Sequence, residues 1–120
     1  MAAVVRRIIS TAKAPTGFGP YSQAVVVDKT VYVAGQIETK QSLRNIGAIL
    51  EAAGSGYDKV VRVMILLDDI KNMPAINEVY ATFSETLPAR VTFQAAALPM
   101  GAKIEVEAIG IVGERAVTMA

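Results

Sequence analysis

Residues 59–67 read Lys-Val-Val-Arg-Val-Met-Ile-Leu-Leu, with apolar residues at both odd and even positions. Because the side chains of a β-strand alternate between the two faces of its sheet, this pattern predicts a strand that is covered on both faces. The odd-numbered residues would lie on one face and the even-numbered residues on the other: Val61, Val63, Ile65 and Leu67 against Val60, Met64 and Leu66.

A helix is predicted on each side of this strand. Before it, apolar residues recur at helical spacing over residues 38–53, and Gly54 then supplies a left-handed C-terminal stop. After it, Asn72 is expected to cap a second helix that ends near Leu87. One face of each helix should be buried, the first through Leu43, Ile46, Leu50 and Ala53 and the second through Ile76, Val79, Tyr80 and Phe83.

Five further strands complete the pattern. Three precede the first helix, over residues 4–10, 22–28 and 30–35, and the last two of these are expected to form a hairpin. Two follow the second helix, over residues 90–97 and 103–112. The predicted order is βββαβαββ, which describes a single α+β domain over residues 1–120 with a six-stranded sheet.

Two helices can cover only one face of a six-stranded sheet. The other face would expose apolar side chains, and an exposed apolar patch of several hundred Å² is uncommon in a soluble monomer. We therefore expect a second copy of the chain to pack there, which predicts a homo-oligomer. The alternative is that the N-terminal segment folds back over this face.

The composition limits the chemistry that is available. The 120-residue chain is 52% hydrophobic and 19% charged, which is typical of one globular domain. It contains no Cys and no His, so disulfides, thiol nucleophiles, imidazole bases and Cys/His metal sites are excluded, and no metal or other cofactor is expected. A formal net charge of +1 gives no basic surface for nucleic acid. Catalysis would have to come from carboxylates, Arg, Lys, Tyr, hydroxyl groups and backbone amides.

No apolar run approaches the ~18 residues of a transmembrane helix, and Arg6 and Arg7 interrupt the stretch that a signal peptide would need. We therefore expect a cytoplasmic protein with no membrane partner. No acidic residue precedes Asp28, a bias that is also found in mitochondrial presequences. A mitochondrial or a nuclear location is the alternative.

Two polar sets occur in the last two predicted strands. Glu105 and Glu107 share one face of the strand 103–112, and Arg90 shares a face with Thr92 in the strand before it. If these strands pair as a hairpin, Arg90 lies opposite or diagonal to the two carboxylates. The pattern also allows another strand between them, and an ordinary ion pair on a solvated face explains the same residues.

Three other residues are candidates for a binding site. Tyr21 follows the turn Gly17-Phe18-Gly19-Pro20, which would hold its ring at the mouth of a pocket. Gly35 ends a strand and would let a ligand approach the backbone, and Asn77 lies beside the apolar stripe of the second helix. The same residues also fit structural roles as a turn anchor, a strand terminator and a helix-border residue.

Five ordered motifs occur between Arg6 and Val112. They are residues 9–15 (Ile-Ser-Thr-Ala-Lys-Ala-Pro), 19–24 (Gly-Pro-Tyr-Ser-Gln-Ala), 35–37 (Gly-Gln-Ile), 87–90 (Leu-Pro-Ala-Arg) and 98–108, from Leu-Pro-Met-Gly to Ile-Glu-Val-Glu-Ala. Together they resemble the RidA/YjgF family, and its animal members most closely. Members of this family are reactive-intermediate imine deaminases, also described as perchloric-acid-soluble translation inhibitors with ribonuclease activity. The resemblance implies a chorismate-mutase-like fold, with both helices on one face of a mixed sheet, and a homotrimer with pockets between its subunits.

The resemblance also implies roles for the candidate residues. Arg90 matches the residue that binds the substrate carboxylate, and Glu105 matches the one that positions the attacking water. Glu107 is expected to raise the pKa of Glu105, because the two carboxylates carry like charges. Four further residues match positions around the ligand: Tyr21, Gly35, Asn77 and Thr92.

The implied reaction is the hydrolysis of small 2-imino acids and their enamines, such as 2-iminobutanoate and 2-iminopropanoate, to 2-oxo acids and ammonia. Two alternatives stay open. One is an endoribonuclease that inhibits translation and has RNA as its partner, and the other is a catalytically silent ligand-binding or chaperone-like oligomer.

The chain departs from the family pattern at three places. Ala34 replaces the usual Ser before Gly-Gln, and Thr92 stands where relatives often carry Cys or Ala. In addition, a loop that relatives carry between the equivalents of Ile37 and Glu38 is missing. Because the motifs on both sides of that position are intact, the same fold is still expected.

Overall fold

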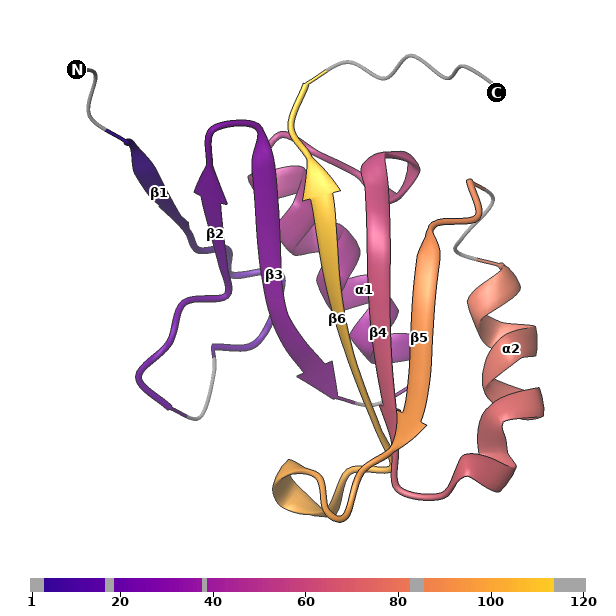
Figure 1. The fold of residues 1–120 in the computed structure, drawn as a ribbon. Helices are drawn as coiled ribbons and strands as arrows, with labels where there is room; N and C mark the ends of the chain where they lie inside the picture. Colours follow the sequence, from indigo (N-terminus) through magenta and orange to yellow (C-terminus); the bar gives the residue numbers. More distant parts are fainter. Residues whose placement is uncertain (1–3, 17–18, 38, 83–85, 114–120) are drawn as a thin grey trace.

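The computed structural model describes residues 4–16, 19–37, 39–82 and 86–113 (Figure 1). Its elements follow the predicted order βββαβαββ, and the largest difference in a boundary is the end of the second helix, which was predicted near Leu87. Within the described ranges, no helix is long and apolar enough to cross a bilayer. The strands and helices are β1 (Arg6–Ile9), β2 (Ala24–Val27), β3 (Thr30–Ile37), α1 (Thr39–Ala52), β4 (Val60–Leu67), α2 (Met73–Ala81), β5 (Ala89–Gln94) and β6 (Ile104–Ile111).

The six strands form one sheet in the order β1-β2-β3-β6-β4-β5. All neighbouring strands are antiparallel except β4 and β5, which are parallel. The last two strands do not pair as a hairpin. The intervening strand that the sequence also allowed is present, because β4 lies between β5 and β6. The physical reason is that β4 is apolar on both faces and takes an interior place, where both of its edges form backbone hydrogen bonds.

α1 packs across β3 and β6 and lies at the centre of the core. Gly54 follows α1 with a φ of 82°, the left-handed conformation predicted for the helix stop. Ser55 then donates a 2.7 Å hydrogen bond from Oγ to the backbone carbonyl of Ile111, which ties the end of the helix to β6. The four apolar residues predicted to face the sheet are all buried: Leu43, Ile46, Leu50 and Ala53.

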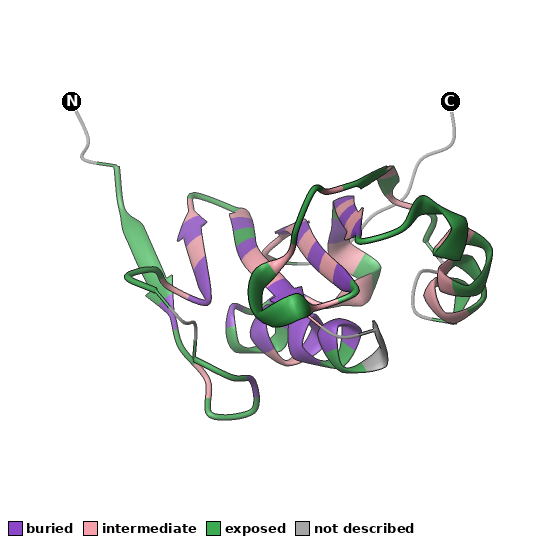
Figure 2. Cartoon of the chain, turned by 90° about the horizontal axis from the view of Figure 1, so that it is seen from below, coloured by how far each residue is buried: buried purple, intermediate pink, exposed green. Residues whose placement is uncertain are grey.

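α2 lies on the same side of the sheet as α1 but next to the β5 edge, and it is far less buried (Figure 2). Asn72 precedes it as predicted, although the Asn72 side chain makes no capping hydrogen bond to the described residues. Ile76, Val79 and Tyr80 pack against the core but are only half-buried, and Phe83 lies outside the described residues. The predicted stripe therefore faces the core but is incompletely covered, because α2 reaches the edge of the sheet and not its centre.

A β-bulge reverses the predicted facing of the first two residues of β4. The pairing of β4 with β6 shifts between Val60 and Arg62. As a result Val60 is buried in the core, whereas Val61 is 48% exposed. The alternation predicted for the rest of the strand is confirmed, with Val63, Ile65 and Leu67 buried under the helices and Met64 and Leu66 on the other face.

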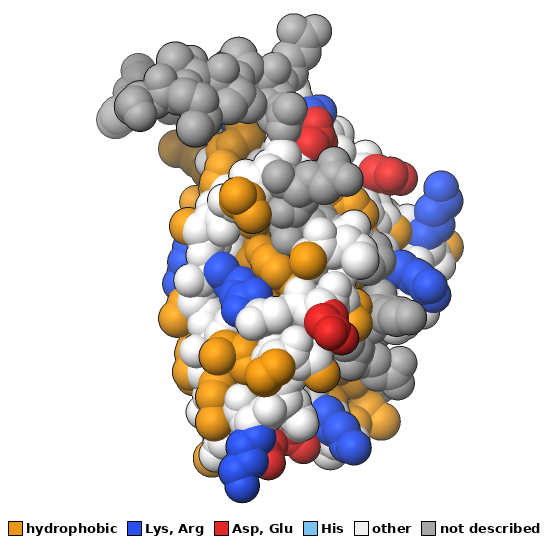
Figure 3. Space-filling view, turned by 90° about the vertical axis from the view of Figure 1, so that its right-hand side faces the viewer, with side chains coloured by type: hydrophobic (Ala, Val, Ile, Leu, Met, Phe, Trp, Pro, Cys, Tyr) orange, Lys and Arg blue, Asp and Glu red, His pale blue; other side chains and the backbone are white. Residues whose placement is uncertain are grey.

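The sheet face opposite the helices is open. Tyr32, Val91 and Phe93 lie on it and are 50%, 39% and 45% exposed. β1 pairs with β2 and extends the sheet, so the described part of the N-terminal segment does not fold back over this face. On the neighbouring side, that of β5 and α2, apolar side chains form separate patches among charged and other polar groups (Figure 3). The open face is therefore available to a second copy of the chain.

Candidate functional site

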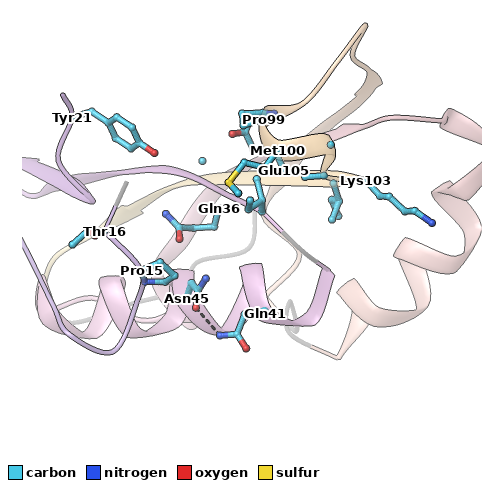
Figure 4. Close-up of a pocket in the computed structure, with 15 residues that line it drawn as sticks. Pro15, Thr16, Tyr21, Gln36, Gln41, Asn45, Pro99, Met100, Lys103 and Glu105 are labelled. Carbon is cyan, nitrogen blue, oxygen red and sulfur yellow. Dashed lines mark hydrogen bonds between the residues drawn. The ribbon is translucent and has the colours of Figure 1, made fainter. Parts of the chain in front are cut away.

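A cavity of about 610 Å³ opens at the end of the sheet where β3 finishes and β6 begins (Figure 4). Its walls come from the segment before β2, the end of β3, the first turns of α1 and the loop before β6. Three residues singled out in the sequence line this cavity: Tyr21, Gly35 and Glu105. We call them the carboxylate cluster. Of the turn before Tyr21, Gly17 and Phe18 lie outside the described residues.

A second β-bulge places Gly35 beneath Glu105. Two residues of β3, Ala34 and Gly35, stand between the paired positions Val33–Ala108 and Gln36–Val106. A Cβ atom built on Gly35 would lie 2.7 Å from both Cδ and Oε1 of Glu105. Glycine is therefore the residue that leaves room for the Glu105 carboxylate at this position, and the bulge fixes where that carboxylate lies.

The electrostatic surroundings of Glu105 favour its protonated form. Burial raises the pKa of the Glu105 carboxyl above its ordinary value, and the negative charge of Glu107 on the same sheet face raises it further. The effect of Glu107 is in the expected direction, although burial is the larger cause. A carboxyl whose pKa is moved towards neutrality can both accept and return a proton, which suits a general base.

The other three candidate residues gather beside α2, and we call them the guanidinium cluster. Nη2 of Arg90 donates a 2.8 Å hydrogen bond to Oδ1 of Asn77, and the guanidinium carbon lies 4.9 Å from the centre of the Tyr80 ring. Thr92 lies two residues further along β5 on the same face, and its Oγ1 is buried without a hydrogen-bond partner among the described residues. The cluster presents a positioned cation and a hydroxyl group with unused hydrogen-bonding capacity.

One chain does not bring the two clusters together. Arg90 is paired with Val63, which is in turn paired with Ala108, so Arg90 lies on the helix-covered face. Glu105 is three residues from Ala108 on β6 and therefore lies on the opposite, open face. The close approach of Arg90 to Glu105 that a hairpin would have given is absent, because β4 separates their strands.

Sequence reasoning missed a residue that holds the outer wall of the cavity. Oε1 of the buried Gln23 accepts a 2.7 Å hydrogen bond from the backbone N–H of Thr11. Its Nε2 lies 2.9–3.1 Å from the backbone carbonyls of Thr11, Ala14 and Pro15. These bonds tie the segment before the cavity to the start of β2. The only signal in the sequence was a Gln within a motif that the resemblance already covered.

Sequence reasoning also missed polar and apolar residues that line the same cavity. Gln41 and Asn45 lie four residues apart on α1 and are joined by a 2.7 Å hydrogen bond. Their spacing places them on one helix face, a signal that the sequence contained. Met100 is 75% exposed at the rim with a φ of 55°, and Lys103 follows it in the loop before β6.

The fold and the two clusters define a class of protein: a small α+β domain with a carboxylate in a pocket at the end of its sheet and a guanidinium near its edge. The family model described as Endoribonuclease L-PSP matches residues 11–112. The chain belongs to this family, which is the RidA/YjgF family, and the resemblance found in the sequence is confirmed.

Among curated proteins, the chain is 48% identical to the 2-iminobutanoate/2-iminopropanoate deaminase of Capra hircus, over 94% of this chain and 95% of the relative. It is 46% identical to the human protein of the same name over the same shares of both chains. Among solved structures, a putative endoribonuclease L-PSP from Entamoeba histolytica superposes with a TM-score of 0.87 at 38% identity, over 90% of this chain and all of that one.

The alignment with the goat protein also bears on the length of this chain. It spans 130 positions, which is more than the 120 residues of the whole chain, so the relative contains residues that this chain lacks. In the structure β3 ends at Ile37 and α1 begins at Thr39, so a single residue connects them. This connection is too short to hold the loop that the resemblance implies at this position.

Proposed function

We propose that this protein hydrolyses small 2-imino acids, such as 2-iminobutanoate and 2-iminopropanoate, to 2-oxo acids and ammonia. The observation that carries the proposal is the placement of the Glu105 carboxylate over Gly35 inside the cavity, with its pKa raised. Deaminases of this name from mammals share 44–48% of their residues with this chain, which supports the same assignment.

The division of the clusters between two faces supports an active site shared by two copies. A small imino acid cannot reach both Arg90 and Glu105 of one chain, because the sheet lies between them. If the guanidinium cluster of one copy faces the carboxylate cluster of the next, the interface is heterologous and must close into a ring. A homotrimer is such a ring and would contain three equivalent sites. It would also cover apolar residues of the open face.

The reaction needs only the groups that these clusters supply. Arg90 would bind the substrate carboxylate through two charged hydrogen bonds. Glu105 would take a proton from water as the water oxygen attacks the electrophilic carbon of the protonated imine. The resulting carbinolamine receives that proton on nitrogen. As its C–N bond breaks and the C=O bond forms, Glu105 takes the proton of the hydroxyl group and passes it to the released ammonia, which leaves as ammonium. Water and iminium ion are thereby converted to 2-oxo acid and ammonium with no other reactant.

The proposal is tested by following an imine directly. An amino-acid oxidase generates 2-iminobutanoate from 2-aminobutanoate, and semicarbazide traps whatever imine remains. Addition of the protein should lower the amount of imine that remains to be trapped. The rate of imine loss should rise in proportion to the protein concentration. A loss rate equal to that with heat-denatured protein would contradict the proposal and favour a silent ligand-binding oligomer.

Cleavage of RNA is the second candidate, because the matching family and the similar Entamoeba protein are both described by the word endoribonuclease. This chain has no His for acid–base work and a net charge of only +1. RNA would become the better-supported substrate only if cleavage survived rigorous removal of other nucleases and was lost when Arg90 was replaced.

Replacing Gly35 with Ala should lower kcat about a hundredfold, because a displacement of ~1 Å at a catalytic group can cost that much. The added Cβ would push the Glu105 carboxylate aside. Steady-state kinetics of imine loss measure the effect. Gly56→Ala is the matched control, since only the tip of the Asp58 side chain approaches that position, and it should leave kcat unchanged. An unchanged kcat in Gly35→Ala would show that the position of Glu105 does not limit the reaction.

Replacing Glu107 with Gln should move the acidic limb of the kcat/KM pH profile to lower pH. The base form of Glu105 is the active one, so activity is lost as the pH falls through its pKa. Removing the negative charge of Glu107 lowers that pKa, while burial still holds it above the ordinary value. Glu51→Gln, at the far end of α1, removes the same charge and should not move the limb. A limb that stays in place in Glu107→Gln would mean that another group titrates.

A further inference from the structure

The cavity continues beyond Glu105 towards α1, where carboxamide side chains form its wall. Gln36, Gln41 and Asn45 line this part, and we call them the amide wall. In Figure 4 they lie on the α1 side of the cavity, whereas Tyr21 and Pro99 lie on the opposite side of Glu105. The reaction proposed above uses none of the three.

Two of the three residues of the amide wall are buried, and the wall has donors and acceptors that no described residue uses. Gln36 and Asn45 are only 8% and 3% exposed. Among the described residues, the side chain of Gln36 makes one hydrogen bond, from Nε2 to the backbone carbonyl of Ala34 at 3.2 Å. Nε2 of Gln41 donates to Oδ1 of Asn45. A carboxamide has both donor and acceptor atoms, so the atoms of this wall that make no hydrogen bond to the described residues suit a ligand that can donate and accept hydrogen bonds.

The size of the cavity points to a substrate longer than 2-iminobutanoate. Cavities of ~300–1,000 Å³ hold drug-sized ligands, and this one has a volume of about 610 Å³. Gln36 from β3 and Gln41 from α1 line the same cavity. A short aliphatic imino acid bound at Glu105 would leave the amide wall unfilled.

Among the described residues, the charged groups that line the cavity are Glu105 and Lys103. The Glu105 carboxylate disfavours a second anion in the same space. In Figure 4 the Lys103 ammonium points away from the amide wall, so it does not neutralise an anionic group there. An apolar side chain would cover the carboxamides of Gln36 and Asn45 without forming hydrogen bonds to them, which lowers the affinity. A neutral side chain that both donates and accepts hydrogen bonds fits the wall best.

We propose that the amide wall is a subsite for the substrate side chain, which selects 2-imino acids ending in a neutral hydrogen-bonding group such as a carboxamide. The imine of glutamine is the representative of this class. The inference rests on the proposed deaminase function and adds to it the chemical class of the substrate side chain.

The test compares two imines of the same shape. Glutamine and homoleucine differ only in that an isopropyl group replaces the terminal carboxamide, and an amino-acid oxidase converts each to its imine. We expect kcat/KM for the glutamine imine to be at least about tenfold higher, because a site built for hydrogen bonding rejects an analogue that lacks the polar group. Gln41→Met and Asn45→Leu, which keep shape and remove hydrogen bonding, should each bring this ratio towards one.

The controls separate this inference from the proposed function. Arg44→Met changes an exposed residue of α1 that does not line the cavity and should leave the ratio unchanged. Gln41 is exposed, so its variant should fold even if Asn45→Leu does not. Equal kcat/KM for the two imines, or a ratio that neither variant alters, would overturn the subsite while leaving deamination intact. If no imine is consumed faster than its spontaneous rate, both proposals fall.

Discussion

Arg90→Ala is expected to lower kcat/KM for 2-iminobutanoate by roughly a hundredfold to ten-thousandfold. Each charged hydrogen bond to a sheltered carboxylate contributes about 1.5–3 kcal/mol, and a bidentate guanidinium supplies two of them. Each 1.36 kcal/mol lost from the transition state is tenfold in rate. Semicarbazide trapping of the remaining imine measures the change. The variant should keep its fold, because Arg90 contacts Asn77 and Tyr80 at the edge of the structure and not in the buried core.

Two further variants make this result specific. Arg90→Lys keeps the charge but loses the bidentate geometry, so its activity should fall between those of the wild type and Arg90→Ala. Arg44→Ala removes an exposed arginine from α1 and should have no effect. If Arg90→Ala kept full activity in an assembly of unchanged size, Arg90 would not be the group that binds the substrate carboxylate, and the proposed mechanism would be contradicted.

Mixing two inactive variants is expected to restore activity. Arg90→Ala keeps a sound carboxylate cluster and Glu105→Gln keeps a sound guanidinium cluster. When the two chains are co-refolded in equal amounts, about one interface in four should combine the intact clusters of neighbouring copies. The mixture should therefore reach about a quarter of wild-type activity, since each cyclic interface is an independent site.

The control for this experiment is a chain that carries both substitutions. Mixed with Arg90→Ala, it offers no intact guanidinium cluster, so activity should stay at the level of Arg90→Ala alone. If the mixture of the two single variants also stays inactive while forming mixed oligomers, Arg90 and Glu105 do not act on one substrate across an interface.

Local patterns in the sequence predicted the elements well. The helical spacing of Leu43, Ile46 and Leu50, with Gly54 behind them, located α1 to within a residue or two. The alternation in residues 104–108 separated Glu105 from the buried Ile104 and Val106. Such patterns show which side chains share a face, because burial of one face places apolar residues at the spacing of the helix or the strand.

The pairing of strands could not be predicted in the same way. Nothing in the residues 90–112 indicates that β4 lies between β5 and β6, because strand order depends on contacts between distant segments. The bulges at Val60–Arg62 and at Ala34–Gly35 were missed for a similar reason. Each changes which residues face the cavity or the core without leaving a regular pattern. The candidate residues were therefore found, but their division between two faces was not.

The place of β6 in the sheet has a consequence for biosynthesis. β6 is the last strand of the chain, yet it pairs with β3 on one side and β4 on the other. While the chain is being translated, β1–β3 and β4–β5 have no strand to join them, and the apolar edges of both groups stay unpaired. Non-local strand pairing of this kind is slow and leaves aggregation-prone edges exposed. We therefore expect the nascent chain to need protection until residue 111 has left the ribosome, after which β6 inserts and completes the sheet.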